Sequence, residues 1–91
     1  MPFIRATYEM VNNPENADSV GWGQNGTVLE IRRVSTLCEQ VLPKYFTHNN
    51  LSSFVRQLNM YGFEKREGAG PHVSHAFFHP NFVRRRGPPR R

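Results

Sequence analysis

The sequence predicts an α+β fold in which short amphipathic helices and short antiparallel strands share one core. Three stretches repeat apolar residues at helical spacing, and four strand-like runs are joined in pairs by turns that contain glycine. With 91 residues the chain has room for one domain, which buries about 60% of the surface of the unfolded chain.

The N-terminal third predicts a helix followed by a β-hairpin. Apolar residues recur at i, i+4 and i+7 within about residues 2–12, namely Ile4, Tyr8 and Val11. After a polar loop, residues 20–31 predict two strands around an Asn-Gly turn, because both positions of a two-residue hairpin turn need positive φ. Trp22 in the first strand is expected to anchor the core.

A second helix is predicted to start at a capping box, in which Thr36 caps the first turn and Glu39 reaches back from three residues later. Pro43 lacks an N–H group and is expected to kink the last turn. The buried stripe of this helix consists of Leu37, Cys38, Val41 and Leu42. A short connection at 47–49 leads into the third helix.

The third helix lies within residues 49–63, which read NNLSSFVRQLNMYGF. Asn50, or Asn49 before it, is placed to cap the first turn, and Gly62 to end the helix in a left-handed conformation. Its buried stripe has the spacing i, i+3, i+4 and i+7: Leu51, Phe54, Val55 and Leu58.

The opposite face of this helix carries mostly hydrogen-bonding side chains, without lysine or glutamate. Its members are Ser53, Arg56, Gln57 and Met60, with Ser52 and Asn59 on the flanks. On a helix face that reads DNA bases, arginine typically contacts guanine, asparagine or glutamine contacts adenine, and serine contacts either base. Taken alone, the stretch is equally well explained as an amphipathic helix with a neutral exterior.

The C-terminal third predicts a second hairpin and a basic tail. Strand-like runs at 63–67 and 73–79 flank a glycine-rich tip. Two helices with a tight connection form a helix-turn-helix, and a hairpin packed beside it is called a wing. The domain is assigned to residues 1–84, and a basic tail or linker, expected to be unfolded, to residues 85–91. The aromatic residues expected in the core here are Phe77, Phe78 and Phe82.

Charge is divided unevenly along the chain, whose net charge is +5. Residues 1–43 carry three Arg against five acids, a net −2, whereas residues 44–91 carry nine Lys and Arg against two acids, a net +7. Since the third helix lies in the positive part, a polyanion is the expected partner. The single Cys38 cannot form an intramolecular disulfide and no long apolar run is present, so we expect a soluble, intracellular chain without a membrane partner.

Residues 41–63, which read VLPKYFTHNNLSSFVRQLNMYGF, closely resemble the DNA-binding domain of eukaryotic heat shock transcription factors. Trp22 and the run FHPNFVR at 78–84 resemble the same domain, so the resemblance covers about residues 3–84. It implies a winged helix-turn-helix, with three helices packed on a small four-stranded antiparallel sheet. It also implies that helix 3 reads heat shock elements, which are inverted GAA-type repeats, through the major groove.

The resemblance assigns roles to individual residues. The family's guanine-reading arginine is Arg56 here, and a guanidinium offers two donors to guanine O6 and N7. Further base, phosphate or water-mediated contacts are implied for Ser53, Gln57 and Asn59. Contacts to the DNA backbone are implied for Lys44, His48, Asn49, Tyr61, Lys65 and Arg84. A core role with only the hydroxyl exposed is the alternative for Tyr61.

Two departures from the family pattern stand out. Glu64 follows the helix where a basic residue is common, and an acid near phosphates weakens binding by repulsion. The stretch between Glu67 and Val73 is shorter than the usual wing, which in this family is thought to serve contacts between neighbouring domains.

The resemblance implies double-stranded DNA as the partner, no cofactor, and a transcription factor of the stress response. The expected location is the nucleus, with a cytoplasmic location before activation. The family's heptad-repeat trimerisation region is not among these residues, so we expect a homotrimer only in a longer chain and a monomer for this one.

Three other classes of function have less support in the sequence. No nucleophile pair, P-loop or paired carboxylates support an enzyme. His72, His75 and His79 fall within eight residues, but along a strand the last two lie about 13 Å apart, too far to share a metal ion. A winged-helix module that binds protein or RNA without reading DNA sequence is the remaining alternative.

Overall fold

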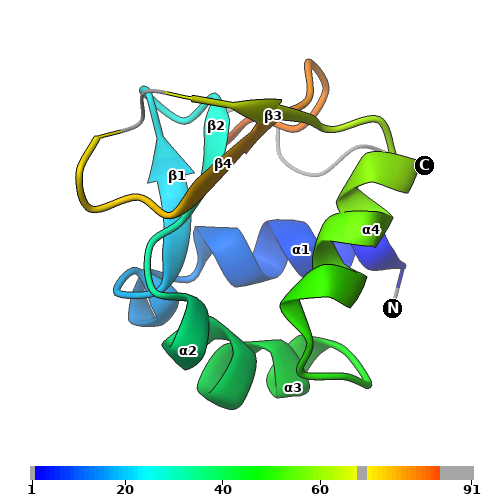
Figure 1. Ribbon diagram of the computed structural model, residues 1–91. Coiled ribbons are helices and arrows are strands. Elements are labelled where there is room, and N and C mark those ends of the chain that lie inside the picture. The colour runs from blue at the N-terminus through cyan, green and yellow to red at the C-terminus, as the bar shows by residue number, and fades with distance from the viewer. Residues whose placement is uncertain (1, 68–69, 85–91) are drawn as a thin grey trace.

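The computed structural model describes residues 2–67 and 70–84, and within them lie three helices and four antiparallel strands (Figure 1). The predicted fold class is confirmed. The elements are α1 (Phe3–Asn12), β1 (Val20–Gly23), β2 (Val28–Ile31), the segments α2 (Val34–Thr36) and α3 (Leu42–Tyr45) of one helix, α4 (Leu51–Met60), β3 (Glu64–Arg66) and β4 (His75–Phe78). A 3₁₀ turn, Pro14–Asn16, follows α1.

The sheet has the strand order β1-β2-β4-β3, and α1 lies between it and the α2–α3 helix (Figure 1). The apolar face of the sheet and the buried faces of the helices enclose one core. Its members include Met10, Val20, Leu29, Ile31, Leu37, Leu42, Phe54, Leu58, Phe77 and Phe82. No helix among the described residues combines the length and the apolar character needed to cross a membrane.

The first hairpin is centred on the predicted Asn-Gly pair but has a wider turn. Gly23 pairs with Val28, so four residues connect the strands instead of two. Gln24, Asn25 and Gly26 all have positive φ, at 49°, 62° and 85°. A two-residue turn at Asn25 and Gly26 would let Gln24 pair with Thr27. Because Gln24 is also left-handed, this pair does not form, and the strands end at Gly23 and Val28.

The predicted capping box at the start of the second helix is wrong. The helix begins at Val34, and Thr36 has helical φ and ψ of −64° and −41° without a side-chain cap bond. The first turn is closed instead by the backbone, with the Leu37 N–H donating to the Arg33 carbonyl at 3.0 Å. Packing of Val34 against the core therefore overrides the local capping signal.

The irregularity expected at Pro43 is a π-helical turn, Leu37–Val41, that precedes the proline. The Leu42 N–H donates to the Leu37 carbonyl, five residues back. In a regular helix the Pro43 ring would clash with the carbonyl of Glu39, and the wider turn relieves this conflict. The helix thus continues through the proline to Tyr45.

The three aromatic residues expected in the core divide between two faces. Phe77 and Phe82 are buried, whereas Phe78 is half-buried. Neighbouring residues of a strand point to opposite faces, so Phe78 lies on the outer face of the sheet when Phe77 faces the core. On that face the Arg66 guanidinium carbon lies 4.4 Å from the centre of the Phe78 ring. The prediction of a core position for Phe78 was therefore wrong.

Candidate nucleic-acid interface

Both ends of α4 are set by local signals in its own sequence. The Asn50 side chain accepts a hydrogen bond from the Ser53 N–H at 3.1 Å, which confirms Asn50 as the cap. Beyond the helix, Gly62 has a φ of 87° and the Phe63 N–H donates to the Leu58 carbonyl at 3.0 Å. This is a Schellman motif, which glycine favours because it has no Cβ to oppose the left-handed conformation.

The predicted buried stripe fixes the rotation of α4. Phe54 and Leu58 are fully buried, and Leu51 and Val55 are partly buried against the core. Burying an apolar side chain of this size contributes about 1.5–3 kcal/mol. The opposite side is therefore held toward solvent, and its exposed residues are Ser52, Ser53, Arg56, Asn59 and Met60, here called the exposed α4 face.

Arg56 lies on the exposed α4 face with its charge available. Among the described residues, no ion pair or side-chain hydrogen bond involves its guanidinium, and α4 contains no other charged residue. An unpaired, planar guanidinium on a helix face is suited to bidentate recognition of a base edge or phosphate. An arginine that reads a base needs an exposed and unpaired guanidinium, and Arg56 meets this condition.

Gln57 was predicted beside Arg56 but lies at the rim of a different feature. It is half-buried and helps to line a surface pocket of about 470 Å³ between α1, the α3–α4 connection and α4. The pocket, here called the connector pocket, is lined by Phe3, Lys44, Tyr45, Phe46, Thr47, His48 and Gln57. The structure therefore groups Gln57 with two residues predicted to hold the DNA backbone.

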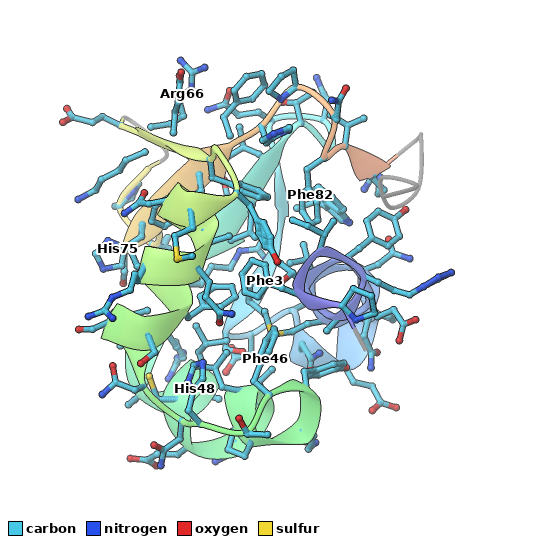
Figure 2. The ribbon with its side chains drawn as sticks, turned by 90° about the vertical axis from the view of Figure 1, so that its right-hand side faces the viewer. Phe3, Phe46, His48, Arg66, His75 and Phe82 are labelled. Carbon is cyan, nitrogen blue, oxygen red and sulfur yellow. The ribbon has the colours of Figure 1, made fainter. Side chains whose placement is uncertain are left out.

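A row of rings in contact runs beside α4 and supports both of its ends. Phe3 lies 5.0 Å from the ring of Tyr61 and 5.5 Å from Phe46, and Phe46 lies 5.8 Å from His48. Figure 2 shows Phe3, Phe46 and His48 following one another alongside α4. Sequence reasoning missed Phe3, because nothing in residues 2–12 indicates that the start of α1 packs against the far end of α4.

His48 connects this aromatic row to the cap of α4. Its Nδ1 accepts a hydrogen bond from the Asn50 N–H at 3.1 Å, so in the neutral ring Nε2 carries the proton. Nε2 is buried and has no hydrogen-bond partner within residues 2–67 and 70–84. A buried donor without an acceptor is unfavourable, so an acceptor that reached Nε2 would be stabilising.

Tyr61 is 45% exposed, with its ring stacked on Phe3. The alternative of a core residue that exposes only its hydroxyl is therefore wrong. Asn49, in the α3–α4 connection, and Lys44 are also exposed, so these two backbone-contact candidates and Tyr61 are accessible.

In the part of the chain that the structure describes, the strand after α4 carries one cation without an ion pair and one engaged cation. Lys65 is exposed, and no ion pair within residues 2–67 and 70–84 involves it. Arg66, by contrast, pairs with Glu64 at 3.4 Å and lies over the Phe78 ring. The charge of Glu64 is thus partly neutralised by its own neighbour.

Arg84 is exposed but lies apart from the other candidates. Its N–H donates to the Gly26 carbonyl at 2.9 Å, and its carbonyl accepts from the Tyr8 hydroxyl at 2.8 Å. The structure does not bring Arg84 to the exposed α4 face, and its contact with DNA stays a prediction.

Residues 3–88 match the model of the HSF-type DNA-binding family. Over 64 residues the chain is 53% identical to heat stress transcription factor A-4b of Oryza sativa, an alignment that covers 70% of this chain. This chain belongs to the HSF-type DNA-binding family. The heat shock transcription factor of Cryptococcus neoformans is a more distant member, 46% identical over 63 residues and 69% of this chain.

Solved structures of HSF-type domains share this fold. Skn7 of Chaetomium thermophilum, crystallised with HSE DNA, superimposes with a TM-score of 0.85 at 36% identity, over 92% of this chain and 88% of that one. A heat shock transcription factor/DNA complex gives a TM-score of 0.69 at 35% identity, over 85% and 90% of the two chains. Both of these HSF-type structures contain DNA.

The chain spans only a small part of its curated HSF-type relatives, 14% of the rice protein and 8% of the Cryptococcus protein. Those relatives are named as transcription factors, which are not enzymes. No group of three or more His, Cys, Asp or Glu residues in the described part of the chain is arranged to hold a metal ion.

Proposed function

We propose that this HSF-type domain binds double-stranded DNA sequence-specifically, with α4 in the major groove of inverted GAA-type repeats. The observation that supports it best is Arg56, exposed on a helix face that is otherwise uncharged and held by buried Phe54 and Leu58. In this arrangement the guanidinium donates to guanine O6 and N7. Ser53 and Asn59 share the exposed α4 face and contact neighbouring bases.

The DNA backbone is held on both sides of α4. Lys44 and His48, in the connector pocket with Gln57, contact a phosphate near the start of the helix. Lys65 contacts the backbone near its end, together with the Tyr61 hydroxyl. Such contacts fix the register of the helix on the duplex, and they carry no sequence information themselves.

The cellular role follows from this activity. We infer a DNA-binding module of a nuclear transcription factor of the stress response, cytoplasmic before activation. The domain acts as a monomer by itself, and as one of three copies in a longer chain with a heptad-repeat region, where linkage raises the effective concentration of each module.

The test is an anisotropy titration of the domain on a duplex with inverted GAA repeats and on a scrambled duplex, at two salt concentrations. Arg56→Ala removes a bidentate contact, and it is expected to lower the preference for the GAA duplex about 5- to 150-fold. Non-specific binding should persist, because the phosphate contacts remain.

Two control variants separate base reading from general charge. Arg33→Ala removes the same charge at the start of α2 and should leave the preference unchanged. Lys44→Ala should weaken both duplexes similarly and reduce the salt slope by about one unit. Equal affinity of the unsubstituted domain for the two duplexes would refute sequence recognition and favour a protein- or RNA-binding role.

A further inference from the structure

Met60 is the most exposed large apolar side chain in the described part of the chain, with 76% of its surface accessible. Met10, in α1, is fully buried. Most large apolar residues here are buried or packed against the core, whereas Met60 stands uncovered at the end of α4 among hydrogen-bonding side chains.

Met60 lies near the middle of the exposed α4 face. At about 100° per residue, its position around the helix falls between those of Arg56 and Ser53. All three residues are exposed, as this projection requires. A partner surface that receives the Arg56 guanidinium therefore also meets the Met60 side chain.

The spacing along the helix defines which part of that surface Met60 reaches. Four residues separate it from Arg56, a rise of about 6 Å. Successive base pairs are about 3.4 Å apart, so Met60 lies within about two base pairs of the guanine that Arg56 contacts. In a GAA unit, the two base pairs next to the guanine on one side are both A·T.

We propose that Met60 contacts the C5-methyl group of a thymine opposite one of these adenines, and that it thereby contributes to specificity for GAA. The thymine methyl is the apolar group that base edges present in the major groove, which matches a methionine placed among hydrogen-bonding side chains. This assignment rests on the proposed function, since it requires α4 to lie in that groove.

The test combines a protein substitution with removal of the methyl group from DNA. Each thymine of the TTC strand is replaced in turn by deoxyuridine, and affinity is measured by anisotropy for the unsubstituted domain and for Met60→Ala. Loss of one buried methyl group should weaken binding of the unsubstituted domain about fourfold at one position. The same replacement should leave the affinity of Met60→Ala unchanged, whereas Met60→Leu should retain the loss.

The outcomes separate the two proposals. If the unsubstituted domain does not prefer GAA duplexes over scrambled ones, the proposed function fails. If that preference is present but deoxyuridine has no effect at either position, or weakens both the unsubstituted domain and Met60→Ala equally, the assignment of Met60 is overturned while sequence recognition stands. Met60 is exposed, so circular dichroism should show all three proteins equally folded.

Discussion

Helix α4 and the β3–β4 hairpin are neighbours in the chain, yet they use their charged residues differently. On α4 the guanidinium of Arg56 is exposed, and within the described residues it has no ionic partner. On the hairpin, Arg66 is engaged by Glu64 at 3.4 Å and by the Phe78 ring at 4.4 Å. The availability of a cation to a polyanion is therefore set by its neighbours, and counting basic residues does not reveal it.

The two cations also differ in the side chains that support them. α4 buries Phe54 completely, whereas the aromatic side chain of the hairpin that supports Arg66, Phe78, is half-buried on the outer face of the sheet. We expect the exposed α4 face to be presented rigidly and the cation of the hairpin to be held mainly by weak surface interactions.

A matched pair of substitutions gives the largest expected effect. Phe54→Ala should lower the free energy of unfolding by about 3–5 kcal/mol, because it leaves a cavity under α4. Phe78→Ala should cost about 1–2 kcal/mol, since its side chain is half-exposed. Urea denaturation followed by circular dichroism measures both. If Phe54→Ala does not fold, Phe54→Leu should still lower the free energy of unfolding more than the same change at Phe78 on the outer face. Similar losses for the two Ala variants would contradict the comparison.

The junction between the two regions depends on Gly62. Its φ of 87° is costly for residues with a Cβ, so Gly62→Ala should destabilise the domain by about 1–2 kcal/mol. Gly62→Asn should cost less, because asparagine tolerates the left-handed conformation. Thermal denaturation of the two variants in parallel provides the measurement, and a smaller loss for alanine than for asparagine would count against the backbone explanation.

The cap of α4 offers a neighbouring control of the same residue type. Asn50→Ala removes the bond to the Ser53 N–H and should lower stability by about 1 kcal/mol. Asn49→Ala, one residue earlier and without a cap bond, should change stability by less than about 0.5 kcal/mol. Chemical denaturation distinguishes them, and equal losses would show that the cap bond does not hold the start of α4.

The smallest effect concerns the ion pair of the hairpin. Glu64→Gln frees Arg66 and removes a negative charge, so affinity for any duplex should rise about two- to fivefold at low salt, with little change in stability. Glu67→Gln removes the same charge from a residue without an ion pair in the described part of the chain. A gain from Glu67→Gln as large as that from Glu64→Gln in the anisotropy assay would mean that total charge, and not the pairing of Arg66, limits binding.

The elements that sequence reasoning predicted well are those with local signals. For α4 the cap at Asn50, the stop at Gly62 and the apolar stripe all lie within one short stretch, and each matches the structure. The start of the second helix was missed, because a capping box at Thr36 competes there with the packing of Val34. Local propensity loses where a nearby apolar residue gains more from burial.

The sequence by itself determined which face α4 exposes, since a 3.6-residue period and a buried stripe leave only one face free. Only the tertiary structure decided what surrounds that face. It stacked Tyr61 on Phe3, gathered Gln57 with Lys44 and His48 in one pocket, and set Arg84 beside Gly26. The physical reason is that these contacts join residues far apart in the chain, and their geometry follows from how the whole core packs.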